Sequence, residues 1–116
     1  NASTKGEVID PFVQLDICGC EPDKKTFKTT VVDDNGFNPV WNQKFTFELK
    51  APELALLHFT VYDHEHVSAP RFIGTRVIAR SCLRQGLRCV NLRDFAGKMQ
   101  GDFRFAKLLC LIEFGP

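Results

Sequence analysis

The sequence predicts an all-β fold, an antiparallel β-sandwich, and three observations favour it. Apolar and polar residues alternate over several short stretches, and residues that favour turns separate those stretches. The two places that could form a helical turn, 51–54 and 81–83, are too short to count as helices in the architecture. The 116 residues suffice for one domain with its own core, so we expect residues 1–116 to form a single domain.

Seven stretches are expected to form strands, and alternation identifies most of them. In chain order they are 12–18, 27–32, 44–49, 57–61, 73–79, 87–92 and 105–114. The stretch 44–49 is the clearest, because Phe45, Phe47 and Leu49 alternate with polar residues. A sandwich in which one face of each strand is buried follows from this pattern.

Turn residues agree with these boundaries. The stretches 19–23 and 33–36 contain glycine, proline, aspartate and asparagine, which tolerate the backbone angles of tight turns. Asn38-Pro39 requires a loop, because proline cannot donate to a strand ladder.

Composition limits the functional classes. The net charge is +1 with both signs scattered, and this argues against nucleic-acid binding, which usually needs a clear basic excess. No serine or cysteine sits in a recognisable nucleophile motif, and no glycine-rich phosphate loop is present. We therefore expect a binding module and not an enzyme.

The cysteines and the apolar runs indicate a cellular setting. Five cysteines without a tight spacing pattern do not form a disulfide framework, which favours a reducing, cytoplasmic environment. Cys82, Cys89 and Cys110 sit among apolar neighbours, where free thiols are often buried. No apolar run approaches the ~20 residues that span a bilayer. Any membrane role is therefore expected to be peripheral.

The stretch 107–114 is apolar on both of its faces. Such a strand needs cover on both sides. Two interpretations stay open: a central or covered strand of this sandwich, or a strand whose outer face docks on another domain or subunit.

Acidic residues collect where strands end. Asp10 precedes one strand, Asp63 and Glu65 follow another, and Asp33-Asp34 lies in a turn. Two carboxylates ~5 Å apart repel by ~3 kcal/mol at an effective dielectric of ~20, so a cluster of them needs compensation. Calcium, which takes 6 to 8 oxygen ligands, is one solution. The alternative is that these acids are solvated on unrelated loops.

Several motifs, in order along the whole chain, resemble one family. They are Gly6-Glu7-Val8-Ile9-Asp10-Pro11-Phe12-Val13, the block 32–41 with Asn35-Gly36-Phe37-Asn38-Pro39-Val40-Trp41, Ala51-Pro52-Glu53-Leu54-Ala55-Leu56, Phe72-Ile73-Gly74, and Leu83-Arg84-Gln85-Gly86-Leu87-Arg88. The chain resembles the C2 domain of eukaryotic phosphoinositide-specific phospholipase C and of its catalytically inactive relatives. The resemblance implies a type II, eight-stranded antiparallel sandwich with calcium and phospholipid loops at one end, attached to a catalytic barrel.

The resemblance also identifies candidate metal ligands. The candidates are Asp10 in the first loop, Asp34 or Asn35 in the second, and Asp63 in the third, where Glu65 replaces the second acid of the family. Arg71 stands where calcium-binding members often have an acid, so calcium affinity is expected to be low or lost. Either the Arg71 guanidinium supplies the positive charge in place of calcium, since it pairs well with carboxylates, or it points into water.

Two groups of residues are candidates for contact with an anionic phospholipid membrane. The loop tips offer apolar side chains, namely Val8, Ile9, Val67, Ala69 and Pro70. A basic group consists of Lys24, Lys25 and Lys28, each worth ~1 kcal/mol near an anionic surface. The alternative for the lysines is a solvated strand face.

The first strand that the resemblance implies is missing from this chain, because Asn1 already matches the first loop. Unpaired backbone groups at such a gap invite another chain, so dimerisation or strand exchange is expected. The sequence therefore predicts a cytoplasmic, peripheral membrane-docking module of a phospholipase C-like protein. The alternative is a protein-interaction scaffold that packs on the catalytic barrel or a partner without lipid or calcium.

Overall fold

The computed structural model describes residues 10–32, 39–65, 67–93 and 107–115. Within these ranges the elements are β1 (Pro11–Cys18), η2 (Glu21–Asp23), β2 (Lys25–Lys28), η3 (Pro52–Leu54), β3 (Leu56–Asp63), β4 (Arg71–Ala79), η4 (Arg80–Cys82), β5 (Gly86–Asn91) and β6 (Lys107–Ile112). The three η elements are single 3₁₀ turns. The described part of the chain is therefore all-β, and it contains no helix long and apolar enough to cross a membrane.

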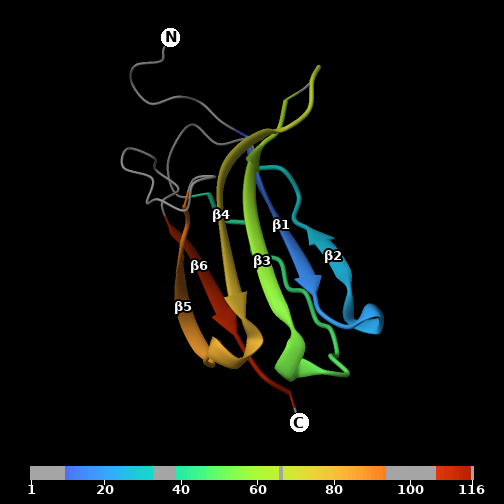
Figure 1. Ribbon diagram of the computed structural model, residues 1–116. Helices are drawn as coiled ribbons and strands as arrows, with labels where there is room; N and C mark the ends of the chain where they lie inside the picture. Colours follow the sequence, from blue (N-terminus) through green and yellow to red (C-terminus); the bar gives the residue numbers. More distant parts are fainter. Residues whose placement is uncertain (1–9, 33–38, 66, 94–106, 116) are drawn as a thin grey trace.

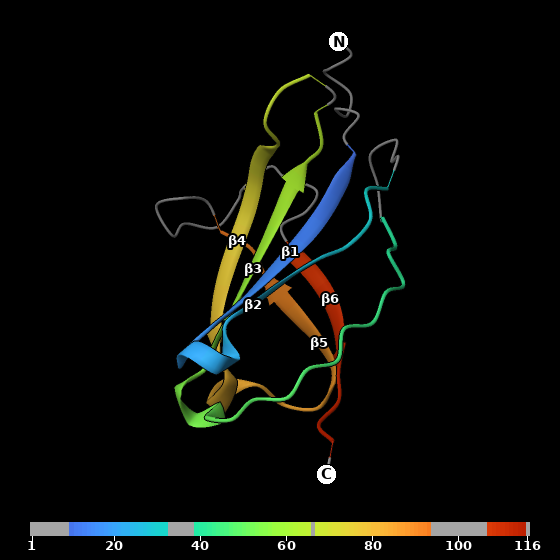
Figure 2. The same ribbon diagram turned by 90° about the vertical axis from the view of Figure 1, so that its right-hand side faces the viewer.

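The strands form two antiparallel sheets that face each other. One sheet has the order β2-β1-β3-β4, and the other is the pair β5-β6 (Figures 1 and 2). The segment 39–50 runs in the same layer as β5 and β6, beyond β6 (Figure 2). The antiparallel sandwich predicted from alternation is thus present.

The central pairing of β1 with β3 fixes which side chains face the core. Leu15 lies opposite Phe59, and Ile17 lies opposite Leu57. A slip of one residue would turn all of these side chains outward, so burial specifies the register.

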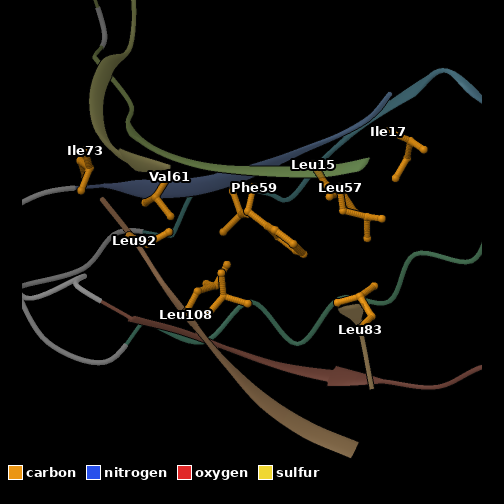
Figure 3. Packing of buried hydrophobic residues seen from close by; sticks show 11 residues of the cluster. Leu15, Ile17, Leu57, Phe59, Val61, Ile73, Leu83, Leu92 and Leu108 are labelled. Carbon is orange, nitrogen blue, oxygen red and sulfur yellow. The ribbon is translucent and has the colours of Figure 1, made fainter. Parts of the chain in front are cut away.

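The core lies between the two layers. Figure 3 shows Val61, Phe59 and Leu57 pointing from the four-stranded sheet toward Leu108 and Leu92 of the other side. Val61 and Leu92 are completely buried. Full burial of such a side chain stabilises the fold by ~1.5–3 kcal/mol.

The prediction of a strand at 44–49 is wrong. Phe45, Phe47 and Leu49 are half-buried and alternate with exposed residues, as expected, but residues 39–50 belong to no ladder. Phe45 and Phe47 pack on the Phe27 ring, with centroids 5.1 and 5.4 Å from it. The alternation reports which face of the segment is buried, and it does not require a neighbouring strand.

Two smaller expectations also need correction. The second strand ends at Lys28, and beyond it the Thr29 N–H still donates to the Val13 carbonyl at 2.9 Å. Cys82 and Cys89 are exposed and not buried. Only Cys110 is half-buried among these three, and burial raises the pKa of its thiol to about 11.

Gly74, the last residue of the Phe72-Ile73-Gly74 motif, lets the two layers approach. A Cβ at this position would lie 3.0 Å from the Leu92 Cβ and 3.6 Å from the Arg93 carbonyl oxygen. The fully buried Leu92 has no space to move into, and overpacking of this kind costs ~1–3 kcal/mol. We expect Gly74→Ala to lower the free energy of unfolding in urea by that amount. Ser81→Ala, at an exposed position, is the control, and equal stability of the two variants would contradict the packing argument.

Candidate functional site

Asp63, the last residue of β3, is a buried carboxylate at one end of the sandwich. It is only 6% exposed, and both of its oxygens have partners from the chain itself. The Asp10 N–H donates to Oδ1 at 2.9 Å, and Arg71 Nη2 donates to Oδ2 at 3.0 Å. A buried carboxylate that accepts charge-assisted hydrogen bonds in this way is neutralised within the fold.

The strand register brings these three residues together. Asp63 pairs with Pro11 of β1 on one side and with Arg71 of β4 on the other. The His64 N–H donates to the Asp10 carbonyl at 2.9 Å, which ties the chain just before β1 to the chain just after β3. Asp10 therefore meets Asp63 at the same end of the sandwich.

Of the other candidate metal ligands, the structure describes only Glu65. Glu65 follows Asp63 by two residues and is half-buried, whereas Asp34 and Asn35 lie outside the described residues. Among residues 10–32, 39–65, 67–93 and 107–115, no group of three or more His, Cys, Asp or Glu gathers as a metal site. Asp10 contacts Asp63 through its backbone N–H. This group is a hydrogen-bond donor and cannot serve as a calcium ligand, which must be an oxygen atom.

The Arg71–Asp63 ion pair joins a buried acid to a partly exposed base. The Arg71 side chain is 48% exposed, whereas that of Asp63 is 8% exposed. Solvent screens the pair on the arginine side, so its contribution to stability is that of a partly exposed pair, ~1 kcal/mol. Its effect on metal binding is larger, because the guanidinium places a fixed positive charge beside Asp63 Oδ2, the oxygen that a metal cation would otherwise coordinate.

The loop after β3 presents apolar side chains to solvent at this same end. Val67 is 95% exposed, and Ala69 and Pro70 are exposed as well. Val8 and Ile9, the other two candidates for lipid contact, lie outside the described residues. The described tip is thus a small apolar projection without aromatic rings.

The lysine group lies along β2. Lys24, Lys25 and Lys28 are all exposed. Lys24 Nζ lies 2.8 Å from Glu21 Oε2, and this ion pair raises the pKa of Lys24 and lowers the pKa of Glu21. Lys25 also borders a shallow pocket of about 360 Å³ whose other lining residues are Pro22, Asp23, Thr46, Phe47, Glu48 and Lys50.

The structure does not bring the apolar tip and the whole lysine group together. Lys25 pairs with Ile17, near the end of β1, whereas the tip lies beyond Asp63, which pairs with Pro11 at the start of β1. Six steps of ~3.3 Å along β1, from Pro11 to Ile17, separate these two ends by ~20 Å. A flat membrane surface can therefore contact both the apolar tip and Lys25 only if the sandwich lies on its long side.

Asp23 is the carboxylate that sequence reasoning missed. It is 1% exposed, and it accepts the Lys50 N–H at 2.7 Å and the Ala51 N–H at 3.0 Å. These two hydrogen bonds lower the pKa of Asp23, and the one from the Lys50 N–H has the larger effect. Cys20 Sγ adds a third contact at 3.3 Å, and the Asp23 carboxylate raises the pKa of that thiol. Asp23 thus ties η2 to the end of segment 39–50.

Comparisons with known proteins agree with this fold. The family model described as "C2 domain" matches residues 1–94. A solved structure of the C2A domain of plant Extended Synaptotagmin 1 superposes with a TM-score of 0.69 and 31% identity, covering 87% of this chain and 73% of that one.

Two relatives are longer proteins. The human 1-phosphatidylinositol 4,5-bisphosphate phosphodiesterase gamma-2 is 39% identical over 91% of this chain and 8% of its own length. The mouse 1-phosphatidylinositol 4,5-bisphosphate phosphodiesterase eta-1 is 47% identical over 76% of this chain and 5% of its own length. The chain thus spans less than a tenth of either relative. It belongs to the C2 domain family, and it is similar to the C2 domains of phosphoinositide-specific phospholipases C, as the sequence motifs predicted.

Proposed function

We propose that this C2 domain docks peripherally on anionic phospholipid membranes at the cytoplasmic side, with little or no dependence on calcium. The observation that carries the proposal is the end of the sandwich where Asp63 is neutralised by Arg71 and the Asp10 N–H beside the exposed Val67. A neutralised acid needs no metal to approach a negative surface, and an apolar tip can enter the interface. The candidate ligands Asp10, Asp34, Asn35, Asp63 and Glu65 then form at most a weak calcium site.

The lysines of β2 supply the attraction for anionic lipid headgroups. Lys25 and Lys28 are exposed on the edge strand of the four-stranded sheet, and each contributes ~1 kcal/mol near such a surface. Because Lys25 lies far from the tip, the domain docks on its long side, with Val67, Ala69 and Pro70 entering only shallowly.

Vesicle sedimentation tests this function. Binding to vesicles of phosphatidylcholine with phosphatidylserine is expected to be equal in EGTA and in about 1 mM calcium. The double variant Lys25→Gln with Lys28→Gln should bind more than tenfold more weakly, since two lysines together supply ~2 kcal/mol. Lys107→Gln removes an exposed charge from β6 and serves as the control. Absence of binding to these vesicles, or binding that requires calcium, contradicts the proposal.

We take the sandwich as the type II arrangement that the resemblance implies. The six strands and the unpaired segment 39–50 support this interpretation within the described residues.

A second candidate function is docking on a protein, including the catalytic barrel of a longer phospholipase C-like parent. The outer face of β5 and β6 favours it, because Leu87, Leu109 and Leu111 are each 64–67% exposed. Leu87 lies opposite Leu111, so these side chains form one apolar patch. A Leu109→Lys variant that keeps vesicle binding but loses a protein partner would identify this surface.

A further inference from the structure

Three arginines gather at one pole of the sandwich, where β4 leads through η4 into β5. Arg80 begins η4, Arg84 follows η4, and Arg88 lies in β5. Arg84 and Arg88 are exposed, and Arg80 is half-buried. Figure 1 shows this turn at the end of the molecule that lies opposite the loop between β3 and β4. We call Arg80, Arg84 and Arg88 the arginine surface, because one short turn carries three permanent positive charges.

Two of the guanidinium groups are fixed on backbone carbonyls of the same turn. Arg84 Nη1 donates to the Ser81 carbonyl at 3.2 Å and to the Leu83 carbonyl at 2.9 Å. Arg88 Nε donates to the Arg84 carbonyl at 3.2 Å, and its Nη2 donates to the Gln85 carbonyl. Both side chains therefore fold back over the turn. Their charges are held in place before any partner binds, which reduces the entropy that binding costs.

The third guanidinium packs on an aromatic ring. Arg80 Cζ lies 3.9 Å from the centroid of Phe114, and the Phe114 N–H donates to Gln85 Oε1 at 2.7 Å. These contacts hold the chain after β6 against the same turn. A cation–π contact attracts the charge without using an oxygen acceptor, so the N–H donors of Arg80 stay available to an anionic ligand.

No acid neutralises the arginine surface within the described part of the chain. None of the ion pairs between described residues includes Arg80, Arg84 or Arg88. Glu53 of η3 and Glu113 after β6 are exposed acids at the same pole, and neither pairs with these arginines. Backbone carbonyls accept hydrogen bonds from a guanidinium but leave its charge uncompensated. The surface therefore favours an anionic partner.

The place of this surface in the fold favours a protein over a membrane. In the four-stranded sheet, β2 and β4 are the two opposite edges, and η4 follows β4 directly. Three strand spacings of ~4.8 Å separate these edges by ~14 Å. In the orientation proposed above, the lysines of β2 face the membrane. The arginine surface then lies at the far edge, where a protein can approach it.

Exposed leucines border the arginine surface. Leu87, which is 64% exposed, directly precedes Arg88 and lies opposite Leu111, which is 67% exposed. Carboxylates match the forked geometry of guanidinium groups, and an apolar side chain of the same ligand can cover the leucines. A segment that combines acidic and apolar residues therefore complements this pole in both charge and hydrophobicity.

We propose that the arginine surface binds an acidic segment of a partner protein. Aspartate or glutamate carboxylates of the segment pair with Arg80, Arg84 and Arg88, and a neighbouring apolar side chain packs on Leu87 and Leu111. This binding activity is separate from lipid docking. It gives the protein-docking candidate a partner of defined chemistry, and it rests on that candidate only through the two leucines.

The test uses the 116-residue chain and a labelled peptide of about ten residues, in which glutamates flank a central pair of leucines. Fluorescence anisotropy should show saturable binding. The affinity should fall at least about tenfold between about 0.05 M and 0.5 M sodium chloride, because salt screens exposed charges. A peptide with glutamine in place of every glutamate should not bind. The assay contains no vesicles, so its result and the result for lipid docking are read separately.

Variants locate the binding surface. The double variant Arg84→Gln with Arg88→Gln should weaken peptide binding about tenfold. Lys107→Gln removes a charge at the opposite end of β6 and should leave binding unchanged. The double variant Arg84→Lys with Arg88→Lys keeps the charge but loses the forked donors, so it should weaken binding about threefold.

Three results would overturn the proposal. One is equal binding of the glutamate and glutamine peptides, and another is peptide binding that the folded double glutamine variant leaves unchanged. The third is a double glutamine variant that loses vesicle binding while the parent chain fails to bind the peptide, since the arginines then bind lipid headgroups. If that variant fails to fold, the salt dependence and the glutamine peptide decide on the parent chain alone.

Discussion

Asp23→Ala is expected to lower the melting temperature of the domain by about 10 °C. The substitution removes the acceptor of two backbone N–H groups, from Lys50 and Ala51, and leaves both without a partner next to a buried site. It also releases the end of segment 39–50, whose Phe45 and Phe47 cover the Phe27 ring. Calorimetry measures the shift. Glu53→Ala removes an exposed acid at the same pole and should change the melting temperature by about 1 °C or less.

The same residue makes stability sensitive to acid. The pKa of Asp23 is lowered in the folded state, so the unfolded chain binds the proton more readily. Its contribution is complete above the unfolded pKa of about 3.9 and is lost as the pH falls through the folded pKa. Asp23→Asn cannot titrate, so the stability difference between the parent chain and this variant should be largest above about pH 5 and should shrink below about pH 4. A difference that is constant over this range contradicts the assigned role.

Alternation in the sequence predicted five of the strands because it reports which face of a stretch is buried. It identified β1 and β3 within one or two residues, since each has both a buried face and neighbours on two sides. It failed at 44–49 for the same reason. Phe45, Phe47 and Leu49 are half-buried against Phe27 and the core, but whether another strand lies alongside to pair with this segment depends on other parts of the chain.

The candidate site was predictable only in part. The positions of Asp10 and Asp63 at adjoining strand ends predicted that they lie at one pole. The structure adds that the Asp10 N–H donates to Asp63 Oδ1, which a pattern of residue types cannot reveal. Asp23 was missed because its two donors lie 27 and 28 residues further along the chain.

Arg71→Asp is expected to convert the Asp63 end of the domain into a calcium-sensitive one. The variant removes the guanidinium from Asp63 Oδ2 and adds a carboxylate beside it. Without a cation, two carboxylates ~5 Å apart repel by ~3 kcal/mol, which should lower the melting temperature by about 10 °C. Calcium can then bind the freed oxygens, with Glu65 two residues away as a further ligand.

The measurement is the melting temperature in EGTA, magnesium and calcium. For a Kd of ~0.1 mM, about 1 mM calcium stabilises the folded state by ~1.4 kcal/mol, so the variant should recover ~5 °C in calcium. Magnesium should recover less, because it demands a stricter octahedral geometry. The parent chain should not respond to either ion, since Arg71 already supplies the charge. Arg84→Asp carries the same charge change at the opposite pole and should also give no response. A parent chain that calcium stabilises as strongly as the variant contradicts the role assigned to Arg71, because Asp63 would then bind the ion with the guanidinium still in place.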